Sequence, residues 1–122
     1  MTKKLLFVFT ILLVVAFVAT AADATGQWVF GQPGKQAVLT LKVDGGKLTG
    51  SVVRPGDATE TQIAEGKVNG DNIYFKLTLL MRGASVTSEY SGPVSGKEIQ
   101  FKVTRPGPDG APQSKTETWT RK

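Results

Sequence analysis

The sequence contains no cysteine and no histidine among its 122 residues. These absences exclude disulfide bridges, thiol nucleophiles, imidazole general bases and the thiolate or imidazole ligands of zinc sites. A Ser-His-Asp triad is excluded for the same reason. We therefore expect a protein that is not an enzyme and that carries no metal or other cofactor.

The carboxylates that remain do not suggest an acid–base pair. Four aspartates lie in predicted turns, where short polar side chains stabilise the backbone: Asp44, Asp57, Asp71 and Asp109. Glu89 and Glu98 are predicted to point outward, and Glu60, Glu65 and Glu117 are expected to approach one another only by chance. Calcium binding at Asp44 or Asp71 is not expected either, because too few oxygen ligands surround them.

After Asp23 the sequence has neither the residue pattern of an amphipathic helix nor that of a nucleic-acid-binding site. No glycine-rich segment precedes a helix, so no helix N-terminus is present to hold a phosphate. Aromatic residues do not alternate with Lys or Arg as in a base-stacking groove. The positive charges of the +5 chain are interspersed with negative ones rather than clustered. We expect no nucleic-acid partner.

The N-terminal segment is typical of a secretory signal peptide. Lys3 and Lys4 precede an apolar run of 14 residues, Leu5–Val18, and small residues stand at the positions for cleavage after Ala21. Cleavage would leave one domain over residues 22–122, exported to the periplasm or beyond and free of the membrane, with a formal charge of +3. The alternative is a retained membrane anchor, although a spanning helix needs about 20 apolar residues.

One short pattern occurs three times in the remaining chain. Residues 43–52 read VDGGKLTGSV, residues 68–77 read VNGDNIYFKL, and residues 94–103 read VSGKEIQFKV. Each copy ends one apolar strand, reverses at a glycine and begins the next strand with alternating apolar residues, which is the signature of a β-hairpin.

The whole chain after Asp23 therefore predicts an all-β meander of eight antiparallel strands, and a bulge is expected at Glu65–Gly66. The predicted strands are Gln27–Phe30, Gln36–Val43, Lys47–Val53, Thr59–Val68, Asn72–Met81, Ala84–Val94, Glu98–Arg105 and Ser114–Arg121. Such a meander buries its apolar face by closing into an up-and-down barrel, which also removes exposed strand edges. A β-sandwich is the alternative.

The two ends of this meander resemble those of the calycin superfamily, which comprises lipocalins, fatty-acid-binding proteins and avidins. Gly26-Gln27-Trp28 matches the Gly-x-Trp motif of the first strand, and Arg121 matches the cation that crosses that Trp from the last strand. The resemblance implies a barrel closed at one end by the pair Trp28 and Arg121. The short chain favours an avidin-like size, but the pattern that holds biotin in avidins is not recognisable.

The chain also resembles small exported β-barrel domains of environmental bacteria. The shared segments are DATGQW at residues 23–28, DGGKLTG at residues 44–50 and YSGPVSG at residues 90–96. This second resemblance implies export and a lipocalin-like barrel, and it implies no particular activity.

An eight-stranded barrel has room for side chains or for one small ligand. We expect a non-enzymatic binding or accessory module for a small apolar or planar molecule. The candidate ligand-binding residues are Trp28, Leu41, Phe75, Leu77, Tyr90, Phe101 and Trp119. Trp28 and Trp119 are either core and closing residues or part of a stacking platform. The alternative is a module that binds an envelope protein, for example a protease inhibitor that inserts residues 22–25, by analogy of fold alone.

Overall fold

A computed structural model describes residues 23–122. The expected signal peptide and its cleavage point after Ala21 lie outside the described residues. All regular elements of the described part are strands: β1 (Gly26–Gln32), β2 (Lys35–Asp44), β3 (Lys47–Val53), β4 (Thr61–Gln62), β5 (Ala64–Asn69), β6 (Asn72–Met81), β7 (Ala84–Ser95), β8 (Glu98–Pro106) and β9 (Pro112–Arg121). Between residues 23 and 122 no helix could cross a membrane.

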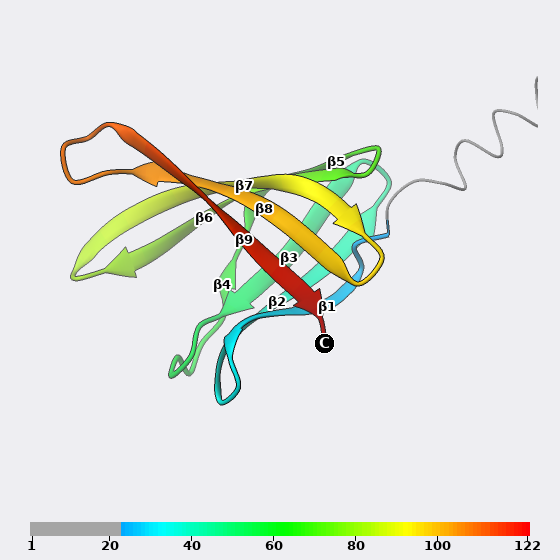
Figure 1. Cartoon of the computed structure of the whole chain (residues 1–122), viewed down its shortest axis with the longest axis horizontal. Helices are drawn as coiled ribbons and strands as arrows, with labels where there is room; N and C mark the ends of the chain where they lie inside the picture. The colour runs from blue at the N-terminus through cyan, green and yellow to red at the C-terminus, as the bar shows by residue number, and fades with distance from the viewer. Residues whose placement is uncertain (1–22) are drawn as a thin grey trace, which may run out of the picture.

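The strands form one antiparallel sheet that closes on itself (Figure 1). Strands that follow one another in the chain pair, except β4 with β5, and β1 also pairs with β9. β4 and β5 together fill the place of one strand between β3 and β6. The result is an eight-stranded up-and-down barrel. The predicted barrel is confirmed, and the sandwich alternative is excluded.

The fourth predicted strand needs a correction. The third and fifth predicted strands coincide with β3 and β6 at both ends, but the segment predicted as one strand over Thr59–Val68 is divided into β4 and β5 at Ile63. The bulge expected at Glu65–Gly66 is confirmed, because the pairing with β6 shifts between Ala64 and Lys67. At Gly66 a Cβ atom would lie 1.9 Å from the carbonyl oxygen of Leu48, so only glycine permits this approach to β3.

Alternate residues of each strand point into the barrel, as the period of two requires. Their apolar members form a single core, to which β7 also contributes the small polar Ser88. The buried apolar residues are Ala24, Trp28, Leu39, Leu41, Leu48, Val52, Ile73, Phe75, Leu77, Tyr90, Ile99, Phe101, Val103 and Trp119.

The barrel is closed by hydrogen-bonded pairing at only one end, called here the closed end. Between β1 and β9 the pairing covers Trp28 with Arg121 and Val29 with Thr120. Between β5 and β6 it stops at Ala64 and Lys76. Between β7 and β8 it stops at Glu89 and Thr104.

Beyond these points the hairpins separate. Figure 1 shows the β6–β7 and β8–β9 hairpins projecting away from the β1–β2 turn. We call this second end the mouth. Here the missing pairing leaves openings toward solvent between neighbouring strands.

Candidate functional site at the barrel mouth

The closed end is sealed by Arg121 and Trp28. The guanidinium carbon of Arg121 lies 4.2 Å from the centroid of the Trp28 ring. The same guanidinium donates hydrogen bonds to the carbonyl oxygens of Thr25 (2.9 Å), Asp23 (3.1 Å) and Gly96 (3.3 Å). Trp28 Nε1 donates to the carbonyl oxygen of Ala24 at 2.9 Å. The segment 23–25 is thereby held against the barrel end.

The seven residues expected to bind a ligand all lie in the barrel core. Their side chains are at most 7% exposed, and Tyr90 is the most exposed of them. The Phe75 and Tyr90 rings stack at 4.9 Å, and Phe101 meets both edge-on at 5.5 Å. Trp119 also meets Phe101 edge-on at 6.4 Å. The structure thus brings Phe75, Tyr90, Phe101 and Trp119 together as aromatic packing, with Leu41, Leu77 and Trp28 in the same core.

Two hollows open at the mouth. The inner hollow, of about 260 Å³, is lined by Val103, Arg105, Gln113, Ser114 and Lys115 of the β8–β9 hairpin. The second, of about 330 Å³, lies where β7 and β8 separate and is called the notch; its lining is Lys76, Thr87, Glu89, Thr104, Arg105, Pro106, Gly110 and Pro112. Neither lining includes any of the seven residues expected to bind a ligand. Arg105 belongs to both linings and so connects the two hollows.

A buried carboxylate stands beside the inner hollow. Glu117 is 6% exposed. Its Oε2 lies 3.2 Å from Lys115 Nζ and 4.0 Å from Arg105 Nη2, and its Oε1 accepts a hydrogen bond from Trp119 Nε1 at 3.2 Å. A buried carboxylate requires such partners, because the protein interior solvates charge poorly. Glu117 therefore pairs with Lys115 and lies close to Arg105 at the mouth.

Sequence reasoning missed this charged group, which we call the mouth cluster: Arg105, Lys115 and Glu117. The signal was present in the alternation of the strands. Counting back by two from the inward Trp119 reaches Glu117 and Lys115. Counting forward by two from the inward Val103 reaches Arg105. The expectation that Glu117 meets Glu60 and Glu65 only by chance did not consider that it faces the interior.

Tyr90 joins the aromatic core to the mouth cluster. Burial raises the pKa of its hydroxyl to about 12, with a further rise from the Glu117 carboxylate and an opposing effect of Arg105. The neutral phenol is therefore the form present at ordinary pH.

Arg105 has an unused donor at the junction of the hollows. Its Nε is buried and has no hydrogen-bond partner among the described residues. A buried donor without an acceptor costs about 1–3 kcal/mol. The side chain as a whole is 28% exposed, so it remains reachable from the mouth.

The remaining chemistry of the described part is limited. Residues 23–122 contain no group of three His, Cys, Asp or Glu side chains that could hold a metal ion.

The fold and the site together define a small antiparallel β-barrel with one sealed end and one charged, open mouth. No protein-family model matches the chain, and no curated protein matches it significantly.

Proposed function

We propose that this protein is an exported, non-enzymatic binding module that holds one small planar or apolar molecule at the barrel mouth. The observation that carries the proposal is the inner hollow, which opens to solvent and is lined by one apolar residue, Val103, and four polar ones. Concave sites with a few placed polar groups are the usual form of ligand sites in proteins.

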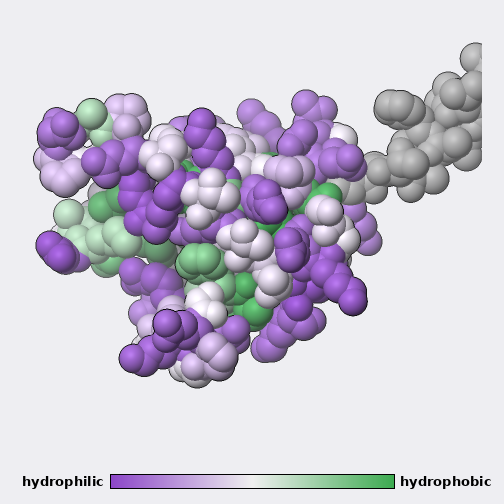
Figure 2. Space-filling view, in the orientation of Figure 1, coloured by the Kyte–Doolittle hydropathy of each residue, from purple (hydrophilic) through white to green (hydrophobic). Residues whose placement is uncertain are grey.

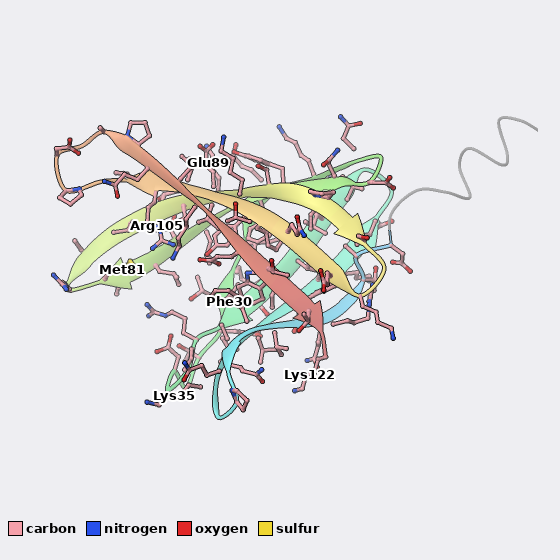
Figure 3. The ribbon with its side chains drawn as sticks, viewed as in Figure 1. Phe30, Lys35, Met81, Glu89, Arg105 and Lys122 are labelled. Carbon is pink, nitrogen blue, oxygen red and sulfur yellow. The ribbon has the colours of Figure 1, made fainter. Side chains whose placement is uncertain are left out.

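Apolar surface at the mouth supports a ligand with a hydrophobic body. Val103, itself only 1% exposed, is the one apolar residue in the lining of the inner hollow. Phe30 stacks on Trp119 at 5.3 Å and remains 36% exposed, and Met81 is 38% exposed. Figure 2 shows hydrophobic residues exposed between hydrophilic flanks on this side of the barrel, and Figure 3 shows Phe30, Met81 and Arg105 on the side where the hairpins separate.

The position of the site differs from the one expected from sequence. The barrel interior is occupied by aromatic side chains that stack on one another. The mouth offers volume without displacing that packing, since its two hollows lie outside the core. This favours the mouth over the interior as the binding site.

Three expectations from the sequence bear on the proposal: the calycin resemblance, export, and the protease-inhibitor alternative. The barrel and the contact of Arg121 with Trp28 support the calycin resemblance. Export rests on the signal-peptide pattern of residues 1–21. The protease-inhibitor alternative is not favoured, because Asp23 and Thr25 are hydrogen-bonded to the barrel through Arg121 instead of forming a free tail.

The proposal is tested by titrating ¹⁵N-labelled protein with 2-naphthamide, a neutral planar molecule. We expect saturable shifts of the backbone amides of residues 103–105 and 113–115. If each heavy atom of the ligand contributes about 0.3 kcal/mol to the binding free energy, the dissociation constant is about 1 mM or lower.

The matched control uses two tryptophan substitutions on the same hairpin. Gln113→Trp fills the inner hollow and should abolish the shifts. Lys102→Trp lies on the outer face of β8 and should leave them unchanged. Shifts that do not saturate, or that survive Gln113→Trp, would overturn the proposal.

A further inference from the structure

We infer that the molecule held at the mouth carries a carboxylate or another single acidic group, recognised by Arg105 and Lys115. This inference rests on the proposed function and adds the chemical class of the ligand. A small aromatic acid, with a planar body and one anionic group, is the class that fits.

The lining of the inner hollow carries positive charge only. Arg105 and Lys115 both belong to it, and the other lining residues, Val103, Gln113 and Ser114, are uncharged. The nearest carboxylate, Glu117, has its Oε2 engaged by Lys115 at 3.2 Å. Two cations therefore face one carboxylate, which leaves a formal charge of +1 in the mouth cluster. An anion that enters the hollow neutralises this charge.

The guanidinium of Arg105 has hydrogen-bond donors that no described residue uses. Its Nη2 is 4.0 Å from Glu117 Oε2, too far for a hydrogen bond, and its buried Nε has no partner among the described residues. Nε and an Nη group of a guanidinium form the planar fork that binds a carboxylate through two parallel hydrogen bonds. Because 28% of the Arg105 side chain is exposed, a ligand carboxylate could bind its Nη groups without breaking the contact between Lys115 and Glu117, and a small shift of the side chain would bring the buried Nε into the fork.

The notch is a weaker place for an anion. Its lining includes Glu89 as well as Lys76 and Arg105. Lys76 is already paired with Glu65 at 3.0 Å, and Glu89 accepts a hydrogen bond from Tyr74 at 2.7 Å. The carboxylate of Glu89 repels an anion from that side. The acidic group is therefore placed in the inner hollow, with Arg105 as its main partner.

The size of the hollow limits the rest of the ligand. A space of about 260 Å³ holds a body of one or two rings. Val103 is the apolar residue of the lining that such a body can contact.

The test compares 2-naphthoate with 2-naphthamide, which have nearly the same shape and differ in charge. At pH 7 we expect the carboxylate to bind about tenfold more tightly, because hydrogen bonds to a charged group are stronger than neutral ones. In Arg105→Gln this preference should fall to about twofold or less. Lys102→Gln removes the same charge from the outer face of β8 and should keep the tenfold preference.

The outcomes separate the two proposals. Equal affinity of both probes for the parent protein, or an unchanged preference in Arg105→Gln, would overturn the acidic-ligand inference and leave the binding function standing. Binding of neither probe would overturn the proposed function itself. Binding of 2-naphthamide by Arg105→Gln reports that this variant is folded. If that variant does not fold, Lys115→Gln replaces it, with a fall in the preference again expected.

Discussion

Arg121 closes one end of the barrel through several directed contacts made by a single side chain. It covers the Trp28 ring and donates to three backbone carbonyl groups that come from two separate segments. The Gly-x-Trp and terminal Arg motifs indicated that these two residues belong to the ends of the meander. The link from Arg121 to Gly96 could not be predicted, because it depends on how the β7–β8 turn folds over the barrel end.

Replacing Arg121 should therefore destabilise the barrel. In Arg121→Met the apolar stem remains, while the cation and its hydrogen bonds are lost. We expect a loss of about 1–3 kcal/mol in the free energy of unfolding, measured by urea denaturation. Lys122→Met, on the adjacent exposed residue, should change stability by less than about 0.5 kcal/mol. Equal effects of the two substitutions would show that Arg121 does not seal the barrel.

Tyr90 gives a prediction for alkaline pH. The folded pKa of about 12 lies above the ordinary value of 10.0. The folded state thus holds its proton more tightly than the unfolded state, and the stabilisation is fully present below pH 10. This stabilisation is lost as pH rises from 10 to 12. The loss amounts to about 2–3 kcal/mol in the free energy of unfolding.

The measurement uses Tyr74→Phe, which leaves Tyr90 as the only tyrosine of the two in the sequence. Absorbance at 295 nm should report a midpoint near pH 12 while circular dichroism shows that the barrel is still folded. Tyr90→Phe should lose less stability than the parent between pH 10 and pH 12. A midpoint near pH 10 in the folded protein would contradict the burial of this hydroxyl beside Glu117.

At the scale of strands, the strand boundaries could be predicted where hairpins are tight and apolar residues alternate cleanly. β3 and β6 begin and end where the pattern indicated. The break between β4 and β5 was missed because it arises from tertiary pairing: β4 pairs only with β3, and β5 pairs mainly with β6. The early end of pairing between β7 and β8 was missed for the same reason, since both strands continue their alternation beyond Glu89 and Thr104.

Close packing of β2 on β3 gives a test at this scale. At Gly50 a Cβ atom would lie 2.0 Å from the carbonyl oxygen of Thr40, whereas at Gly46 it would meet nothing within 4 Å. Gly50→Ala must shift the paired backbone, and we expect it to cost about 1–3 kcal/mol by urea denaturation. Gly46→Ala is the matched control on the same hairpin and should be close to neutral. A tolerated Gly50→Ala would show that β2 and β3 are not this close.

At the scale of the molecule, the barrel is held together unevenly. Pairing between β9 and β1 is confined to the closed end, and the mouth lacks that support. Local opening should therefore begin at the mouth. In hydrogen exchange followed by NMR, the amides of residues 113–115 of β9 should exchange faster than those of Trp119 and Arg121. Uniform protection along β9 would indicate that the mouth is closed in solution.

The position of the candidate site could be predicted only in part from the sequence. The inward aromatic and aliphatic residues were identified, but their packing against one another depends on ring orientations in three dimensions. The charged residues on the same inward face were passed over, because charged side chains are ordinarily expected in solvent. Of the mouth cluster only Glu117 is buried, and it pairs at 3.2 Å with Lys115, which is largely exposed.

The most direct test of this account is the position of a bound ligand, measured by intermolecular NOEs between the ring protons of 2-naphthoate and the protein methyl groups. A ligand at the mouth gives NOEs to the methyl groups of Val103, a residue in the lining of the inner hollow. NOEs to Leu41 and Leu77 instead would place the ligand in the barrel core and contradict the account.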